Sequence, residues 1–179
     1  MFAKVENNQV VAANSSKDFF KGSTGIYEVI YNTANLKDTE FYYNGAETFT
    51  FANDQVTASY APATAKALND VNAVDEKGQP VLDQDGKQVV IKGLKSNHVA
   101  RIKSQAAGLL QSTDWYVIRN AESQAAIPAN ISTYRAAVRT KSNDMEALIN
   151  AVTTVDQLAD LYKYDINTGT RPLGDFPRL

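Results

Sequence analysis

The residues of this 179-residue chain that could do chemistry are few and scattered. His98 is the only histidine and cysteine is absent, so neither a multi-histidine metal site nor a thiolate metal site can form. We expect His98 to be a surface or capping residue near the start of a helix. Asp83-Gln84-Asp85-Gly86 has the opening of a calcium loop, but the further acidic ligand and the bidentate glutamate are missing. A β-turn explains this tetrapeptide better.

Phosphate-binding and paired-carboxylate patterns are also missing. Neither the Walker-type nor the dinucleotide-type glycine spacing occurs. Neighbouring carboxylates such as Asp75 and Glu76 lie among turn residues, where solvent exposure is expected. The sequence therefore predicts a protein that is not an enzyme, with no catalytic residues, no cofactor and no metal.

Aromatic side chains crowd the first half of the chain. They are Phe41, Tyr42, Tyr43, Phe49, Phe51 and Tyr60. Because neighbours along a strand point to opposite faces, Phe41 and Tyr43 cannot share one core with Tyr42. The aromatic excess has three interpretations: a protein contact surface, a two-sided core covered by the rest of the chain, or stacking on a sugar. Phe41 and Tyr43 are our partner-binding candidates here.

Composition narrows the class of partner. The formal net charge of -2 gives no general attraction to nucleic acid or anionic lipid, and we find no signal peptide and no apolar run that could span a membrane. We therefore expect protein partners, with no nucleic acid and no membrane. All six arginines lie after residue 95, which indicates either contacts in that half or ordinary solvated surface.

The first 60 residues carry strand and turn signals. Asn7-Asn8 separates two apolar runs, and Asn44-Gly45 and Asn53-Asp54 punctuate three more, since Asn, Asp and Gly tolerate the positive φ of tight hairpin turns. These signals predict an N-terminal hairpin followed by a three-strand meander. Residues 61–95 contain two turn clusters, which predict a linker and a β-hairpin arm that lies on the main body, pairs with another subunit or stays mobile.

After Gly93 the apolar spacing becomes helical. We expect helices that begin near Ser96 or Asn97, at Ser112-Thr113-Asp114, at Pro128, at Asn143 or Asp144, and at Thr153 or Thr154. The Pro- and Gly-containing tail should be extended, with Leu173, Phe176 and Leu179 as anchors for a neighbouring surface.

The expected fold class is therefore α+β: a small antiparallel β N-terminal module with a hairpin arm, then a short-helix C-terminal domain and an extended tail. The expected divisions are 1–60 for the β module, 61–95 for the linker and arm, 96–165 for the helical domain and 166–179 for the tail.

One pattern in the helical half is specific. It consists of Leu109-Leu110, Ser112-Thr113-Asp114-Trp115, Ile127-Pro128, Tyr134-Arg135 and Val138-Arg139. This pattern resembles the short helical domain of phage tail assembly chaperone-like and tail-fibre-associated proteins, which carry Leu-Leu-x-x-Ser/Thr-Asp-Trp, a proline and Tyr-Arg-x-x-Leu-Arg. Val138 replaces the usual leucine, and the similarity covers roughly a quarter of the chain. We expect Trp115 and Tyr134 to be core residues and Asp114 to cap a helix.

Two arginines of the pattern, Arg135 and Arg139, are four apart on one helix face and could reach a carboxylate such as Glu122 or a carbonyl at a helix end. They are also partner-binding candidates. The resemblance implies a bacteriophage tail structural protein at the baseplate or a fibre attachment point, oligomeric in the assembly and located in the virion after assembly in the host cytoplasm. The alternatives are a tail or tail-fibre assembly chaperone that is not retained in the virion, and a host-glycan-binding module.

Overall fold

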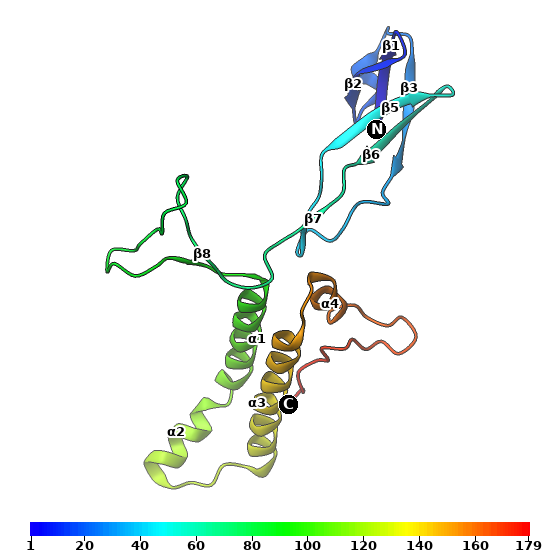
Figure 1. Cartoon of the computed structure of the whole chain (residues 1–179). Helices are drawn as coiled ribbons and strands as arrows, with labels where there is room; N and C mark the ends of the chain where they lie inside the picture. Colours follow the sequence, from blue (N-terminus) through cyan, green and yellow to red (C-terminus); the bar gives the residue numbers. More distant parts are fainter. The chain divides into compact units, whose positions relative to one another are not determined.

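The computed structural model describes residues 1–179 and has the α+β architecture that the sequence predicts. Its internal contacts divide the chain into two compact units, Met1–Ala65 and Lys66–Leu179. Figure 1 shows a curled sheet in the first unit and helices with a protruding arm in the second. No helix combines the length and the hydropathy that a membrane span requires.

Two tight hairpins build most of the first unit. β1 (Phe2–Glu6) pairs with β2 (Gln9–Asn14), and β5 (Glu47–Ala52) pairs with β6 (Gln55–Tyr60). The turn residues have positive φ, 51° and 61° at Asn7-Asn8 and 51° and 56° at Asn53-Asp54. Both predicted turns are confirmed, because Asn and Asp adopt this conformation at low cost.

The sheet is mixed, so the expectation of a purely antiparallel module is wrong. Its strand order is β2-β1-β3-β6-β5, and β3 (Ile26–Asn32) pairs antiparallel with β1 but parallel with β6. The edge strands β2 and β5 approach each other, which curls the sheet around a small core. The core consists of Ala3, Val29, Val56 and Ala58. The remainder of this part includes a single 3₁₀ turn, Lys17–Phe20.

The predicted hairpin at Asn44-Gly45 does not form. β4 (Tyr42–Tyr43) pairs instead with β7 (Thr64–Ala65). The Asn44 side chain accepts a hydrogen bond from Lys37 N (2.9 Å) and donates one to Lys37 O (3.0 Å), and a Cβ at Gly45 would collide with the carbonyl of Ala61. Asn44 therefore links two loop segments through its side chain, and Gly45 allows the backbone of Ala61 to come close. Both tasks favour the same residue types as a turn.

The arm, residues 71–91, belongs to the second unit. It begins and ends with β8 (Val71–Asn72) and β9 (Val90–Ile91), which pair antiparallel. Two further legs close at the predicted turns Asp75–Gly78 and Asp83–Gly86, where isolated bridges join Val74 to Pro80 and Leu82 to Gln88. In Figure 1 both legs project from the helices. The arm therefore has three legs, two of them free.

An eight-residue repeat explains this shape. Ala73, Val81 and Val89 are eight residues apart and close a ring of backbone hydrogen bonds: Val81 N to Ala73 O, Val89 N to Val81 O, and Ala73 N to Val89 O, at 2.8–3.0 Å. The Gln88 Nε2 amide donates to the same three carbonyl oxygens, at 2.7, 3.2 and 3.0 Å. The Gln88 side chain thus gives hydrogen-bond partners to the carbonyl groups at the centre of a segment that has little apolar core.

The helices are α1 (Leu94–Gln111), α2 (Asp114–Ser123), α3 (Ala129–Ala151) and α4 (Val155–Asp160). The capping box of Thr154 with Gln157 confirms the predicted start of α4. Two expectations are wrong. α1 begins at Leu94, before Ser96, and α3 runs through Asn143 and Asp144 without a break, because its buried face continues through Met145 and Ile149.

α1 and α3 lie side by side and hold the core of the second unit. Ala106 packs with Tyr134 and Val138, and Leu109, Leu110 and Phe176 surround them. Leu173 in the tail is fully buried, and its amide donates to Leu161 O at 3.0 Å. The extended tail therefore fastens to the chain's own helices.

Candidate interaction surfaces

The most specific sequence pattern forms a polar cluster at the α1–α2 junction, made of Leu110, Thr113, Asp114 and Arg135. Arg135 Nη1 donates to Leu110 O (2.9 Å) and Thr113 Oγ1 (2.6 Å) and pairs with Asp114 Oδ1 (2.9 Å). The Thr113 hydroxyl also donates to Leu110 O. This junction cluster ties α3 to the end of α1, where helix carbonyls lack intrahelical donors.

Asp114 is part of this cluster and is not the helix cap that we expected. Thr113 occupies the N-cap position, and its side chain makes no capping bond to the first turn of α2. The acidic Asp114 in that first turn is instead drawn to the guanidinium of Arg135. Arg135 thus donates to the carbonyl of Leu110 at the end of α1, which confirms one of the two predicted targets. The carboxylate that it pairs with is that of Asp114, not that of Glu122.

Trp115 is not a core residue, which contradicts the sequence prediction. Its side chain is 50% exposed, and no residue of α2 is buried. The indole lies against Tyr116, with ring centroids 4.0 Å apart, and the Arg119 guanidinium lies 4.7 Å from the indole centroid. Ile118, one helical turn further along the same side of α2, is also exposed. We name the exposed side chains of Trp115 and Ile118 the α2 face.

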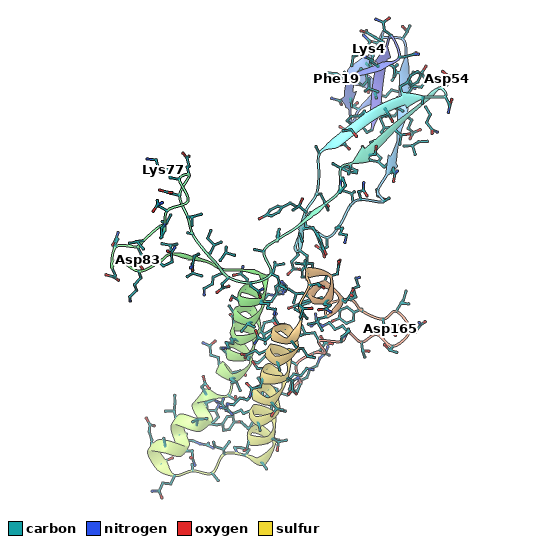
Figure 2. All side chains as sticks on the ribbon, in the orientation of Figure 1. Lys4, Phe19, Asp54, Lys77, Asp83 and Asp165 are labelled. Carbon is teal, nitrogen blue, oxygen red and sulfur yellow. The ribbon has the colours of Figure 1, made fainter.

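The free legs of the arm form a second surface. Val74 and Leu82, equivalent positions of the eight-residue repeat, are 60% and 55% exposed. Each precedes a turn whose first aspartate, Asp75 or Asp83, accepts two backbone amides through Oδ1. Figure 2 shows Lys77 and Asp83 on the two legs. Because these legs are exposed, the first of the three alternatives for the arm, that it lies on the main body, does not hold for them.

Two adjacent hollows lie between α3 and the tail. Their volumes are about 420 and 430 Å³, and both are lined by Ala137 and Pro177. Lys141 lines the first, and Arg178 with Tyr134 lines the second. Neither Lys141 nor Arg178 forms an ion pair within the chain. Each hollow thus combines apolar side chains with one cation that makes no ion pair, and the Lys141 hollow is also lined by Asp144 and Asp175.

His98 is buried, so the surface or capping role that we expected is wrong. Its Nδ1 lies 2.7 Å from Tyr162 Oη and 2.8 Å from Arg101 Nη2. Arginine can only donate, so Nδ1 is an acceptor, and the proton of a neutral ring lies on Nε2. The Arg101 and Arg171 guanidiniums lie 5.3 and 5.8 Å from the Tyr162 ring centroid. This cluster joins α1 to the segment after α4.

Asp70 fastens the base of the arm to the start of α1. Its carboxylate accepts hydrogen bonds from Lys92 Nζ (2.8 Å) and Gly93 N (2.9 Å). The hydrogen bond from Lys92, together with those from Ser96 and from the Gly93 amide, lowers the pKa of Asp70 from 3.8 to about 2. Asp70 is therefore ionised over the whole physiological range.

The predicted partner-binding residues fall into two groups. Phe41 (2% exposed), Arg135 and Leu173 are buried, which is the opposite of what a contact residue requires. Phe41 lies in a turn closed by its amide to Asp38 O, so the strand alternation that we assumed does not apply to it. Tyr43 (65% exposed), Arg139 and Leu179 are exposed, and Phe176 is half-buried against α1 and α3.

Sequence reasoning missed the α2 face and the repeat in the arm. The signal for the repeat was present, since Asp-x-x-Gly recurs at Asp75 and Asp83 with a valine six residues after each aspartate. The exposure of Trp115 had no local signal, because a tryptophan at helical spacing is the usual mark of a core.

Comparison of the chain with models of protein families, with curated proteins and with solved structures finds no match.

Proposed function

We propose that this chain is a structural protein of a bacteriophage tail, at the baseplate or at a fibre attachment point, and acts through contacts with other tail proteins. The observation that carries the proposal is the α2 face. Its Trp115 belongs to the motif that resembles the phage tail proteins and stays half exposed, whereas Arg135 of the same motif is buried and pairs with Thr113 and Asp114. Exposed tryptophans are enriched among the residues that dominate protein interfaces.

The junction cluster supports this assignment in a second way. Thr113, Asp114 and Arg135 account for most polar positions of the motif as fold-forming residues. Trp115 is the one large apolar residue of the motif that the fold leaves exposed, so a role outside the chain is the simplest reason for its presence. The arm adds a second contact surface in the same unit, with aliphatic side chains on its free legs.

Phage particles test the proposal directly. Particles purified from the phage that encodes this chain should contain a stoichiometric band of about 19.6 kDa. Its consistent absence from complete particles would overturn the structural role and favour the assembly chaperone. The glycan-binding alternative has less support, because a stacking surface needs exposed rings. Tyr43 is exposed, but Phe41 is buried.

A Trp115→Ala variant tests the surface that carries the proposal. Because the indole is half exposed and contacts mainly Tyr116 and Arg119, we expect a loss of only about 1–2 kcal/mol of unfolding free energy, not the 3–5 kcal/mol of a core tryptophan. The folded variant should fail to enter particles. A matched Ile166→Ala variant, at an exposed loop position outside the α2 face, should enter normally. Normal incorporation of Trp115→Ala would contradict the proposal.

A further inference from the structure

We propose that the free legs of the arm bind the two tail hollows of a second copy of this chain, so that copies associate head to tail. A second copy is thus the partner of one surface of the proposed tail protein. The contact involves the pure chain alone and does not depend on the phage role.

The first observation is the repeated chemistry of the legs. Each free leg presents one exposed aliphatic side chain, Val74 or Leu82, followed by acidic residues at the tip. The first aspartate of each turn is occupied by backbone amides, and the next acidic residue, Glu76 or Asp85, makes no ion pair within the chain. A leg is therefore an apolar side chain with a carboxylate beside it.

The second observation is the matching chemistry of the hollows. There are two, adjacent to each other, and each has apolar lining from Ala137 and Pro177 with one unpaired cation, Lys141 or Arg178. Asp144 also lines the Lys141 hollow, whereas Asp175 is already paired with Arg171 at 2.7 Å. We therefore assign the leg with Leu82 and Asp85 to the Arg178 hollow, where its carboxylate meets a guanidinium.

The net charges of the arm and of the rest of the second unit are also opposite. Residues 71–91 hold four carboxylates and two lysines, a balance of -2, whereas residues 92–179 hold eleven Lys and Arg and eight Asp and Glu, a balance of +3. Opposite charge on two apolar surfaces steers their encounter and fixes their register. The legs remain exposed in their own chain, which leaves them free to contact another copy.

Such a contact is heterologous, because one copy gives its arm and the other its hollows. Repetition of a heterologous contact yields a closed ring or an open filament. The mass of the full-length protein in solution should therefore rise from 19.6 kDa to multiples of it as concentration increases. Added salt should reduce the association, since the pairing charges are at the surface.

A charge exchange in the full-length protein tests the assignment by sedimentation velocity. Asp85→Lys and Arg178→Glu should each weaken self-association by at least about tenfold. An equimolar mixture of the two variants should associate again, because each arm then meets an opposite charge on the unlike chain. Recovery in the mixture also shows that both variants are folded. Glu28→Lys makes the same charge change as Asp85→Lys at an exposed position of β3 and should associate like the wild type.

Three results would overturn the inference. A wild-type chain that stays at 19.6 kDa up to about 200 µM would mean that the partner of the arm is a different protein. Equal weakening by Glu28→Lys would show a general effect of charge. If the mixture of Asp85→Lys and Arg178→Glu failed to associate, the proposed contact between the arm and the hollow would be contradicted. None of these results alters the particle test of the proposed function.

Discussion

At the scale of single residues, Arg135 holds the junction of α1, α2 and α3. Its guanidinium is buried and serves three acceptors, but its Nε atom has no hydrogen-bond partner. A buried charge of this kind stabilises through the acceptors that it satisfies, and its removal leaves them unpaired.

Arg135→Ala should therefore lower the unfolding free energy of the second unit by about 2–4 kcal/mol. Asp114→Asn should cost less than about 1 kcal/mol, because that carboxylate is half exposed and its ion pair is screened by water. Urea unfolding of both variants measures the difference. Equal costs for the two substitutions would show that the ion pair, and not the buried acceptors, gives the junction its stability.

Asp70 makes the base of the arm sensitive to acid. Its pKa is about 2 in the folded chain against an ordinary value of 3.8, so the unfolded chain binds this proton first as pH falls. The stabilising contribution of Asp70 is complete above the ordinary value and is lost as pH falls from there through about 2.

Asp70→Asn should remove that part of the pH dependence. The difference in urea midpoint between wild type and Asp70→Asn should be constant from pH 7 to pH 5 and should shrink between pH 4 and pH 2, as the wild-type carboxylate is protonated. Glu122→Gln, at an exposed position of α2, is the matched control. A difference that stays constant down to pH 2 would contradict the depressed pKa.

At the scale of elements, local sequence signals predicted the features that depend on only a few neighbouring residues. The turns at Asn7-Asn8 and Asn53-Asp54 follow from backbone preferences of two residues, and the start of α4 follows from Thr154 and Gln157. The parallel pairing of β3 with β6 brings together residues separated by a whole hairpin, so no local pattern specifies it.

The same distinction explains the errors in the candidate sites. Asn44-Gly45 has the composition of a turn, but the distant Lys37 and Ala61 decide how it is used. Trp115 has the spacing of a core residue, but burial depends on whether another element covers α2, and none does. Tyr134 and Val138 of the same motif are core residues because α1 packs on them.

Gln88 should hold the arm together as an element. Its two amide protons are shared among three carbonyl oxygens at the centre of the three legs, where no apolar core exists to replace them. Gln88→Leu should release the amide protons of Ala73, Val81 and Val89 to fast hydrogen exchange while α1 and α3 keep their protection. Gln84→Leu, at an exposed turn, is the control. Unchanged protection of those three amides in Gln88→Leu would show that the backbone ring suffices.

At the scale of the whole molecule, the chain has two separate cores. Val56 is fully buried in the sheet of the first unit, and Val138 is fully buried between α1 and α3 in the second. Since Trp115 is the only tryptophan and lies in the second unit, its fluorescence reports the unfolding of that unit in the intact protein. The two cores can therefore be perturbed and observed separately.

Val138→Ala should lower the urea midpoint measured by Trp115 fluorescence, with a loss of about 2–3 kcal/mol from the lost methyl groups and the cavity. Val56→Ala removes the same atoms from the first unit and should shift this signal less, while hydrogen exchange of β3 and β6 amides should show the larger loss there. The two variants are matched controls for each other. Equal shifts of the fluorescence midpoint in both would mean that the chain unfolds as one cooperative body, and the division at Ala65 would have no thermodynamic meaning.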